Sequence, residues 1–280
     1  MVRTLLAAAA LVLLWQGVLL IASIFFAEPF SAEYGTLEIG RKVEAVVFRT
    51  ERLITAPCDG RFVRYHAAGE RIARHGLVGI VEPAGAKAKR KVATPAAGLL
   101  CYTFDGLEGE WPRPRLLADP EGAYRAGRKS RPRPTAAGGV RRGVPVARLV
   151  EDSEGYLLVR LRGKEEPAAG KRLWARLRGG AIPLEVVATT VRNHESWLIL
   201  RTELFPPDWL DRRRVEFELI FARFTGTLVP LRYLYTRGEQ TGVFVLRRGR
   251  AVFRAVKVLG QDRDRAVLAD LPPGTLLVTR

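Results

Sequence analysis

The sequence predicts a mainly β protein that begins with a transmembrane helix. Short runs of alternating or β-branched apolar residues recur along the chain, and turn signals such as RGG, RRG and PPG separate them. This pattern is typical of barrels and sandwiches. Beyond the N-terminal segment no stretch shows extended helical periodicity. With 280 residues, of which 48% are hydrophobic, the chain is long enough to bury two or three modest cores. The clearest strand candidates are 45–48, 156–161, 184–190, 197–200, 215–221, 242–246 and 251–259.

The first 27 residues predict a membrane anchor. Between Leu5 and Ala27 the only strongly polar side chain is Gln16. About 23 residues form roughly 34 Å of helix, which is enough to cross the hydrocarbon core of a bilayer. Phe25 and Phe26 occupy positions where a signal-peptide cleavage site needs small residues, so an uncleaved anchor is favoured over a removed signal peptide.

Charges on either side of this span predict its orientation. Arg3 precedes the span, whereas Glu28, Glu33 and Glu38 follow it before the next basic residues. The positive-inside rule then places the N-terminus in the cytoplasm and the rest of the chain outside the cell membrane. Gln16 near mid-span either hydrogen-bonds a neighbouring helix or is tolerated as a single polar residue.

The chain is strongly basic, with a formal charge of +17 and a pI near 10.7. Such a balance suits anionic partners, namely nucleic acid, anionic lipid headgroups or acidic envelope polymers, and it equally fits a solvated basic surface. Because the body is expected outside the cytoplasm, nucleic acid is excluded as the expected partner, and membrane lipid remains.

A repeated phrase predicts a two-half sandwich. "ITAPCDGRFV" begins at Ile54 and "VATPAAGLLC" begins at Val92, 38 positions later. Each copy places a Pro (Pro57, Pro95) three residues before a Gly (Gly60, Gly98). The Pro presets φ, and the Gly is expected to adopt a φ that most residues avoid. Gly69 is expected to supply a second turn of the first half. Two interlocked copies can share one small core that neither buries alone.

These residues resemble a known family. "APCDGRFVRYHAAGERIARHGLVGIV" followed by "VATPAAGLLCYTFDGLE" is similar to the barrel-sandwich hybrid of HlyD-type membrane fusion proteins, the periplasmic adaptor subunits of efflux and secretion transporters. "VRRGVPVARLVEDSEGYLLVRL" (140–161) resembles the stretch that closes the sandwich and enters the β-barrel. Residues 226–280 resemble the membrane-proximal domain. The likeness covers most of residues 45–280.

The resemblance implies a domain order and a function. The expected segments are an anchor helix (1–27), a linker with the first membrane-proximal strand (28–50), a barrel-sandwich hybrid (51–152), a β-barrel (153–222) and a membrane-proximal β domain (223–280). The implied role is an extracytoplasmic adaptor that binds an inner-membrane transporter of ABC or RND type and gathers into a homo-oligomeric ring.

Two departures from the family pattern affect this expectation. Many members insert a long α-helical hairpin between the sandwich halves, but here the gap is only "EPAGAKAKRK". Residues 109–142, which are rich in Pro, Gly and Arg, replace part of the usual second half. Their composition predicts a partly ordered loop or a flexible insertion.

Two other functions remain open. An envelope scaffold for cell division or wall assembly would use the same basic β body without any transport role. A biotinyl or lipoyl carrier, which is related in fold, would carry a modified lysine near Lys87; its flanks "GAKAKRK" match neither the Met-Lys-Met nor the Asp-Lys context of such carriers.

The sequence offers no candidate catalytic, cofactor-binding or metal-binding residues. His66, His75 and His194 show no tight ligand spacing, and no nucleophile has a base partner at a useful spacing. We therefore expect no enzyme activity and no cofactor. Cys58 and Cys101 fall one in each sandwich half, and whether they form a disulfide is left open.

Overall fold

A computed structural model describes residues 29–85, 88–163, 167–192 and 194–279. The expected anchor, with Leu5, Gln16 and Ala27, lies outside the described residues, as does Lys87. Within the described part of the chain, no helix is long and apolar enough to cross a membrane. That part is mostly β-strand with two short α-helices, so the mainly β class is confirmed.

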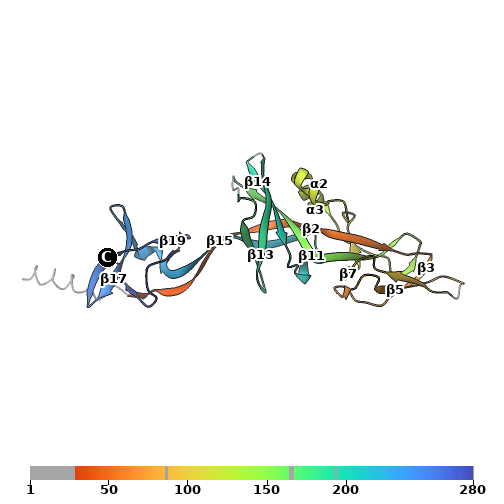
Figure 1. Ribbon diagram of the computed structural model, residues 1–280, viewed down its shortest axis with the longest axis horizontal. Helices are drawn as coiled ribbons and strands as arrows, with labels where there is room; N and C mark the ends of the chain where they lie inside the picture. Colours follow the sequence, from red (N-terminus) through yellow and green to blue (C-terminus); the bar gives the residue numbers. More distant parts are fainter. Residues whose placement is uncertain (1–28, 86–87, 164–166, 193, 280) are drawn as a thin grey trace, which may run out of the picture. The chain divides into compact units, whose positions relative to one another are not determined.

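The chain divides into two compact units. The larger unit comprises residues 40–221, and the smaller unit combines residues up to 39 with residues 222–280. Two long strands, β2 (Glu33–Thr55) and β15 (Arg214–Pro230), contribute residues to both units. Figure 1 traces the strands of each unit.

The larger unit contains a sandwich of two four-stranded sheets. One sheet has the order β10-β3-β5-β6, and the other is formed by β4, β7 and parts of β11 and β2. The two copies of the repeated phrase lead into β3 and β7, which lie in opposite sheets. The strand bounds are β3 (Gly60–Arg64), β4 (Arg71–Ile72), β5 (Leu77–Glu82), β6 (Arg90–Ala93), β7 (Gly98–Cys101), β10 (Gly138–Val140) and β11 (Pro145–Arg162).

One core joins the two sheets of the sandwich. Both copies of the repeat contribute to it, because Phe62 and Leu100 occupy matching places after Gly60 and Gly98. Neither half buries this core alone, which explains why the phrase occurs twice. The buried members are Ile54, Ala56, Phe62, Ile72, Val78, Val81, Val92, Leu100, Tyr102, Val140, Val146, Ala147 and Leu149.

The rest of the larger unit is a closed circuit of six strands, which we call the barrel. The order is β15-β12-β13-β14-β11-β2, and β2 pairs with β15 to complete the circuit. The remaining bounds are β12 (Arg172–Leu177), β13 (Gly180–Arg192) and β14 (Glu195–Thr202). Closure leaves no unpaired strand edge within the circuit, which removes a common route to edge-to-edge association.

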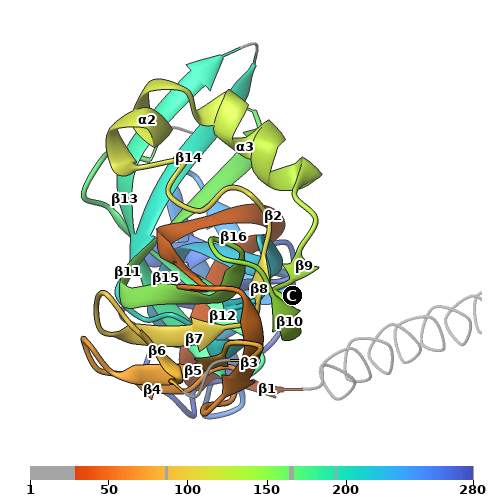
Figure 2. The same ribbon diagram turned by 90° about the vertical axis from the view of Figure 1, so that its right-hand side faces the viewer.

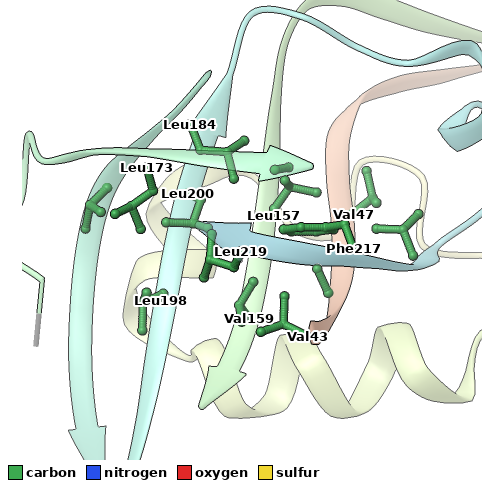
Figure 3. Close-up of a cluster of buried hydrophobic side chains, with 14 of the residues drawn as sticks. Val43, Val47, Leu157, Val159, Leu173, Leu184, Leu198, Leu200, Phe217 and Leu219 are labelled. Carbon is green, nitrogen blue, oxygen red and sulfur yellow. The ribbon is translucent and has the colours of Figure 1, made fainter. Parts of the chain in front are cut away.

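Alternate residues of every barrel strand point into one interior core. Val43, Ala45 and Val47 of β2 are buried there, as are Val215, Phe217 and Leu219 of β15 (Figure 3). This period of two is what a half-buried strand requires. The other interior residues are Leu157, Val159, Leu161, Leu173, Ala175, Leu184, Val186, Leu198, Leu200 and Trp209.

Two helices cover part of the outside of the barrel. They are α2 (Arg113–Ala118) and α3 (Pro120–Lys129), and Figure 2 shows both lying across β14. The outward-facing residues of β2, β11 and β14 are apolar and pack against these helices. The cluster comprises Val46, Phe48, Leu116, Ala123, Tyr124, Tyr156, Leu158, Trp197 and Ile199.

The expectation of a partly ordered loop or a flexible insertion at residues 109–142 is therefore wrong for 113–129, which form these two helices. In α3 the buried residues Pro120, Ala123, Tyr124 and Gly127 have the spacing of one helix face. Asp119 caps this helix by accepting a hydrogen bond from the Gly122 amide at 2.9 Å. The Pro and Gly residues that suggested a loop have places in this helix. Pro120 occupies the first helical position, which favours proline. Gly127 lies in close contact with Val46 of β2. A two-stranded ribbon of β8 (Thr103–Phe104) and β9 (Arg133–Pro134) joins the chain before α2 to the chain after α3.

A short 3₁₀ helix, η1 (Pro207–Trp209), precedes β15. The indole of Trp209 is buried in the barrel core, where its ring lies 5.8 Å from that of Phe217. The turn therefore seals one end of the barrel with an aromatic side chain.

The smaller unit has its own core. Its main sheet has the order β1-β21-β17-β16, with β18 also paired to β17, while β19 and β20 extend from β15. The bounds are β1 (Phe30–Ser31), η2 (Leu231–Tyr233), β16 (Leu234–Arg237), β17 (Gln240–Arg247), β18 (Arg250–Ala255), β19 (Val258–Gln261), β20 (Arg265–Leu268) and β21 (Leu276–Leu277). The buried core residues are Ala32, Val229, Tyr233, Val243, Val245, Ala266, Leu268, Leu271 and Leu277.

Candidate functional site

The first half of the sandwich is tied to the second by the turn that contains Gly69. Pro57 is exposed, and Gly60 begins β3 with a φ of +154°. Gly69 lies in the turn before β4 with a φ of +86°, a left-handed conformation that favours glycine. Its amide donates a hydrogen bond to the carbonyl oxygen of Leu100 at 2.8 Å. A turn of the first half is thereby tied to a strand of the second.

The second copy uses its glycine differently. Pro95 is exposed in the turn before β7, and Gly98 begins that strand with an ordinary φ. The expectation of an unusual φ is therefore wrong for Gly98. A Cβ atom at this position would lie 2.4 Å from the carbonyl oxygen of Val150, so glycine is required because β7 and β11 approach closely.

Gly98→Ala is expected to destabilise the chain by about 1–3 kcal/mol, because the backbone of β11 must move to admit the methyl group. Gly139→Ala is the matched control, since Gly139 also lies in a sandwich strand but has open space around its Cβ position and an ordinary φ. Urea unfolding of the full chain, followed by tryptophan fluorescence, measures both. Equal stabilities for the two variants would contradict the close-contact explanation.

Both cysteines are free. Cys101 is fully buried, and burial raises the pKa of its thiol to about 11, so the thiol stays protonated at neutral pH. Cys58 is half-buried and packs against the sandwich core. The disulfide that the sequence left open is therefore absent from this structure.

The three histidines serve turns rather than a common centre. His66 Nδ1 hydrogen-bonds the carboxylate of Glu70 at 2.7 Å near the sandwich surface. His75 and His194 lie in turns with φ values of 60° and 61°. Among the residues described here, no group of three or more His, Cys, Asp or Glu side chains is arranged to hold a metal ion.

A buried network of charges lies where the sandwich meets the barrel. Glu51 on β2 is 5% exposed and accepts hydrogen bonds from Arg49 Nε at 2.6 Å and Arg148 Nη1 at 3.0 Å. Arg213 Nη2 donates to the second oxygen of Glu51 at 2.7 Å. Arg213 also donates from Nε and Nη2 to the two oxygens of Asp105, at 2.8 and 2.9 Å. Glu51 thus accepts hydrogen bonds from three guanidinium groups, and Asp105 accepts hydrogen bonds from one of these, that of Arg213.

Backbone carbonyl oxygens satisfy further guanidinium protons of this charge network. This matters because a buried charge is costly unless it is both paired and hydrogen-bonded. The three contacts are Arg49 Nη1 to Trp209 O at 2.5 Å, Arg148 Nη2 to Leu210 O at 2.9 Å and Arg213 Nη1 to Val47 O at 3.1 Å.

Both carboxylates of the charge network remain ionised at neutral pH. Burial by itself would raise the pKa of Glu51, but the charges of Arg49, Arg213 and Arg148 outweigh it and lower the pKa below its ordinary value. Burial likewise opposes ionisation of Asp105, whose pKa is nevertheless lowered by the hydrogen bonds and charge of Arg213.

The charge network joins three parts of the larger unit. β11 changes register against β2 between Val150 and Gly155, which pair with Glu51 and Arg49. The network therefore sits at the passage from sandwich to barrel. Ser130, which ends α3, donates its hydroxyl to Asp105 at 2.6 Å, so the helical segment is attached to the same centre. This site was not identified from the sequence. The sequence does contain a signal for it, because Arg49 and Glu51 interrupt the apolar run 45–54 and Arg148 interrupts the apolar run 144–150.

The barrel carries a groove of about 1320 Å³ at one end. Its lining includes Leu177, Ile182 and Phe205, which are half-buried and pack against the barrel core. Arginines and carboxylates also line it, namely Glu44, Arg176, Arg178, Asp208, Arg212, Arg214 and Glu216. Mouths of barrels are common places for a partner or ligand to dock.

No protein-family model matches the chain, and no curated protein matches it. Among solved structures it is similar to ZneB from Cupriavidus metallidurans, with 12% identity, 90% of this chain and 92% of that chain covered, and a TM-score of 0.33. It is similar to MacA from Actinobacillus actinomycetemcomitans, with 8% identity, 90% and 99% covered, and a TM-score of 0.38. A protein of Bacteroides eggerthii described as a candidate efflux transporter shows 11% identity, 89% and 93% covered, and a TM-score of 0.38.

Proposed function

We propose that the chain is a membrane-anchored extracytoplasmic adaptor subunit of an efflux or secretion transporter, of HlyD type, and that it acts by assembly rather than catalysis. The observation that carries this proposal is the sheet topology. Two copies of one sequence phrase lead into strands on opposite sides of a single sandwich core, and the chain then closes a six-stranded barrel. That order matches the barrel-sandwich hybrid and β-barrel which the sequence resembles.

In the adaptor we propose, the link between the two sandwich halves is too short for an α-helical hairpin. β5 ends at Glu82 and β6 begins at Arg90, so seven residues separate them. A helical pair needs about 20 residues or more, since an average helix alone has about 11–12. An adaptor of this kind acts close to the inner membrane, or in an envelope with one membrane, instead of reaching an outer-membrane channel.

In this proposal each segment of the chain has a role. Residues 1–27 anchor the protein in the cell membrane with the N-terminus in the cytoplasm. The smaller unit, which holds both β1 and the C-terminal strand β21, and the barrel contact an inner-membrane transporter of ABC or RND type. The sandwich gathers copies into a ring that extends the conduit.

A second candidate function is an envelope scaffold for division or wall assembly. The observation that favours it is the formal charge of +17, which suits attachment to anionic lipid or acidic polymer. A scaffold and an adaptor would share the fold but not the partner, because fold alone does not define function.

Photo-crosslinking in cells distinguishes these two functions. A photoreactive residue replaces Tyr34, which is 66% exposed in the smaller unit, or Tyr65, which is 51% exposed in the sandwich. We expect the Tyr34 position to capture a membrane permease and the Tyr65 position to capture a second copy of the chain. Capture of division or wall-synthesis proteins from both positions, with no permease, would favour the scaffold.

A further inference from the structure

The hairpin that β17 and β18 form in the smaller unit carries three arginines at its tip. Arg247 ends β17, Arg248 lies in the turn, and Arg250 begins β18. We call these three residues the arginine tip. All three side chains are exposed, and none of their guanidinium groups forms an ion pair with a residue that the structure describes. The charge of the arginine tip is therefore available to a group outside the chain.

Arg247 and Arg250 lie directly opposite each other in the hairpin. They are register partners in its antiparallel ladder. Residues opposed in this way point to the same face of the sheet, with their Cβ atoms about 4.5–5.5 Å apart, and like charges so placed destabilise the ladder. The hairpin therefore holds two cations side by side at a cost in stability.

The turn of the hairpin adds a second cost. Arg248 and Gly249 have φ values of 48° and 75°, so both central residues of this two-residue turn are left-handed. Such a turn strongly prefers asparagine followed by glycine, because asparagine tolerates a positive φ better than most residues do. A residue other than glycine stores strain in this conformation, and strain of this kind occurs at binding sites.

A phosphate group would turn the repulsion between Arg247 and Arg250 into attraction. It offers several anionic oxygens, so it can accept charge-assisted hydrogen bonds from two guanidinium groups at once. The planar fork of arginine also matches the geometry of phosphate. The opposed pair is therefore a candidate phosphate site, and it needs no further side chain to supply a second donor.

An exposed apolar side chain lies beside the arginine pair. Val252 is two residues from Arg250 along β18, so it points to the same face of the strand. Val252 is 47% exposed, and among the described strands β18 pairs with β17 alone. A phospholipid offers a phosphate with an apolar part next to it, whereas a free phosphate would leave Val252 in water. The combination favours a phospholipid as the ligand.

The sheet places the arginine tip near the point where the expected anchor ends. Strands β1, β21, β17 and β18 are neighbours in that order, and Phe30 on β1 lies level with Val245 on β17. With strands about 4.8 Å apart and about 3.4 Å per residue, Arg247 and its partner lie about 12–16 Å from Phe30. The expected anchor ends at Ala27, three residues before Phe30. In the proposed function this short tether keeps the arginine tip close to the membrane surface.

We propose that the arginine tip binds the phosphate group of an anionic phospholipid in the membrane that holds the anchor. Arg247 and Arg250 share the phosphate, and Val252 contacts the apolar part of the lipid next to it. This inference rests on the membrane anchor of the proposed function. It gives the smaller unit a lipid contact of its own, in addition to the contact with a transporter.

The test measures amide hydrogen exchange at residues 246–251 of the full chain in mild detergent at physiological salt. The detergent contains either phosphatidylglycerol or, at the same mole fraction, phosphatidylcholine. A third sample holds inorganic phosphate and no lipid, at matched ionic strength. These samples separate a lipid phosphate from a free phosphate and an anionic headgroup from a zwitterionic one.

The variant carries Arg247→Gln and Arg250→Gln. The matched control carries Arg141→Gln and Arg142→Gln, which remove the same charge from the other Arg-Arg-Gly phrase of the chain, in the turn after β10. Arg141 and Arg142 are exposed like the test pair, but they are consecutive in the chain rather than opposed across a hairpin. Thermal unfolding midpoints check that both variants remain folded.

Without lipid, we expect the Arg247→Gln/Arg250→Gln hairpin to exchange about 1.5-fold to fivefold more slowly than wild type, because the like-charge repulsion is gone. Phosphatidylglycerol should slow exchange in wild type and in the control by about threefold or more, and should leave the variant unchanged. Phosphatidylcholine and inorganic phosphate should slow none of them.

Three results would overturn the proposal. They are no slowing of wild type by phosphatidylglycerol, equal slowing in the Arg247→Gln/Arg250→Gln variant, and equal slowing by phosphatidylcholine or by inorganic phosphate. The detergent contains no transporter, and it presents lipid to the chain whether or not residues 1–27 insert. Failure of the lipid contact is therefore distinguishable from failure of the adaptor function.

Discussion

Glu51→Gln is expected to lower the free energy of unfolding by about 3–5 kcal/mol. The reason is that Glu51 accepts hydrogen bonds from Arg49, Arg148 and Arg213 inside the larger unit. A neutral amide leaves Arg49 without its countercharge and takes one countercharge from Arg148 and Arg213, which keep Glu108 and Asp105 as ion-pair partners. It also replaces one acceptor oxygen by a donor that faces other donors.

The matched control for this substitution is Glu151→Gln. Glu151 also pairs with an arginine, Arg52 at 2.8 Å, but the side chains of the two are 28% and 54% exposed. Exposed pairs of this kind contribute about 0–1 kcal/mol. Urea unfolding of the full chain in mild detergent measures both variants. A loss below 1 kcal/mol for Glu51→Gln would contradict the role given to the charge network.

The charge network also predicts how stability depends on pH. The folded-state pKa values of Glu51 and Asp105 lie below their unfolded values, which are about 4. Their contribution is therefore complete above about pH 5 and is lost as the pH falls below 4 toward the folded-state values. Wild type should lose stability steeply in that acid range. The Glu51→Gln variant should lose less stability in this pH range, because Glu51 no longer takes up a proton on unfolding and only Asp105 does.

Leu116→Ala is expected to destabilise the chain by about 2–5 kcal/mol. Leu116 on α2 is fully buried against the outer face of the barrel, in the cluster that includes Phe48 and Leu158. Removing its side chain leaves a cavity between helix and sheet. The helix propensity changes as well, but by only a few tenths of a kcal/mol.

Leu117→Ala is an internal control for the second prediction. Leu117 has the same side chain on the same helix and is 37% exposed. The propensity change is equal in the two variants, so their difference isolates the packing of α2 on the barrel. If residues 109–142 were a flexible insertion, both variants would have wild-type stability, and that outcome would contradict the structure.

The sequence predicted six of its seven strand candidates because alternation of apolar residues is a local property. The candidate 251–259 is wrong as a single strand, since it is divided between β18 and β19, which belong to different sheets. Val43, Ala45 and Val47 alternate inward, and the barrel core follows that pattern. The helices were missed because α3 has only ten residues and its Pro and Gly content suggested a loop. The continuous apolar run 45–48 did indicate that something covers the outside of the barrel. A strand that is apolar on both faces must be covered on both, and here the helices α2 and α3 cover the outer face.

The charge network lay beyond prediction for a different reason. Glu51 and Arg213 are 162 positions apart, and only the closure of the barrel brings them within 2.7 Å. Charged residues within apolar strands indicate a buried site, but the sequence does not state which of 46 basic residues faces which carboxylate. The glycines of the repeat show a similar limit. Gly60 and Gly98 occupy equivalent places in the repeat, yet one has an unusual φ and the other makes a close backbone contact.

The most direct test of the adaptor function is a mild-detergent pull-down of the full chain after crosslinking in cells, with partners identified and quantified by mass spectrometry. A Gln16→Leu variant run in parallel measures what the expected anchor contributes to partner binding. The adaptor function predicts an ABC- or RND-type permease at near-stoichiometric yield. Recovery of division or wall-synthesis proteins alone, with no permease, would contradict it.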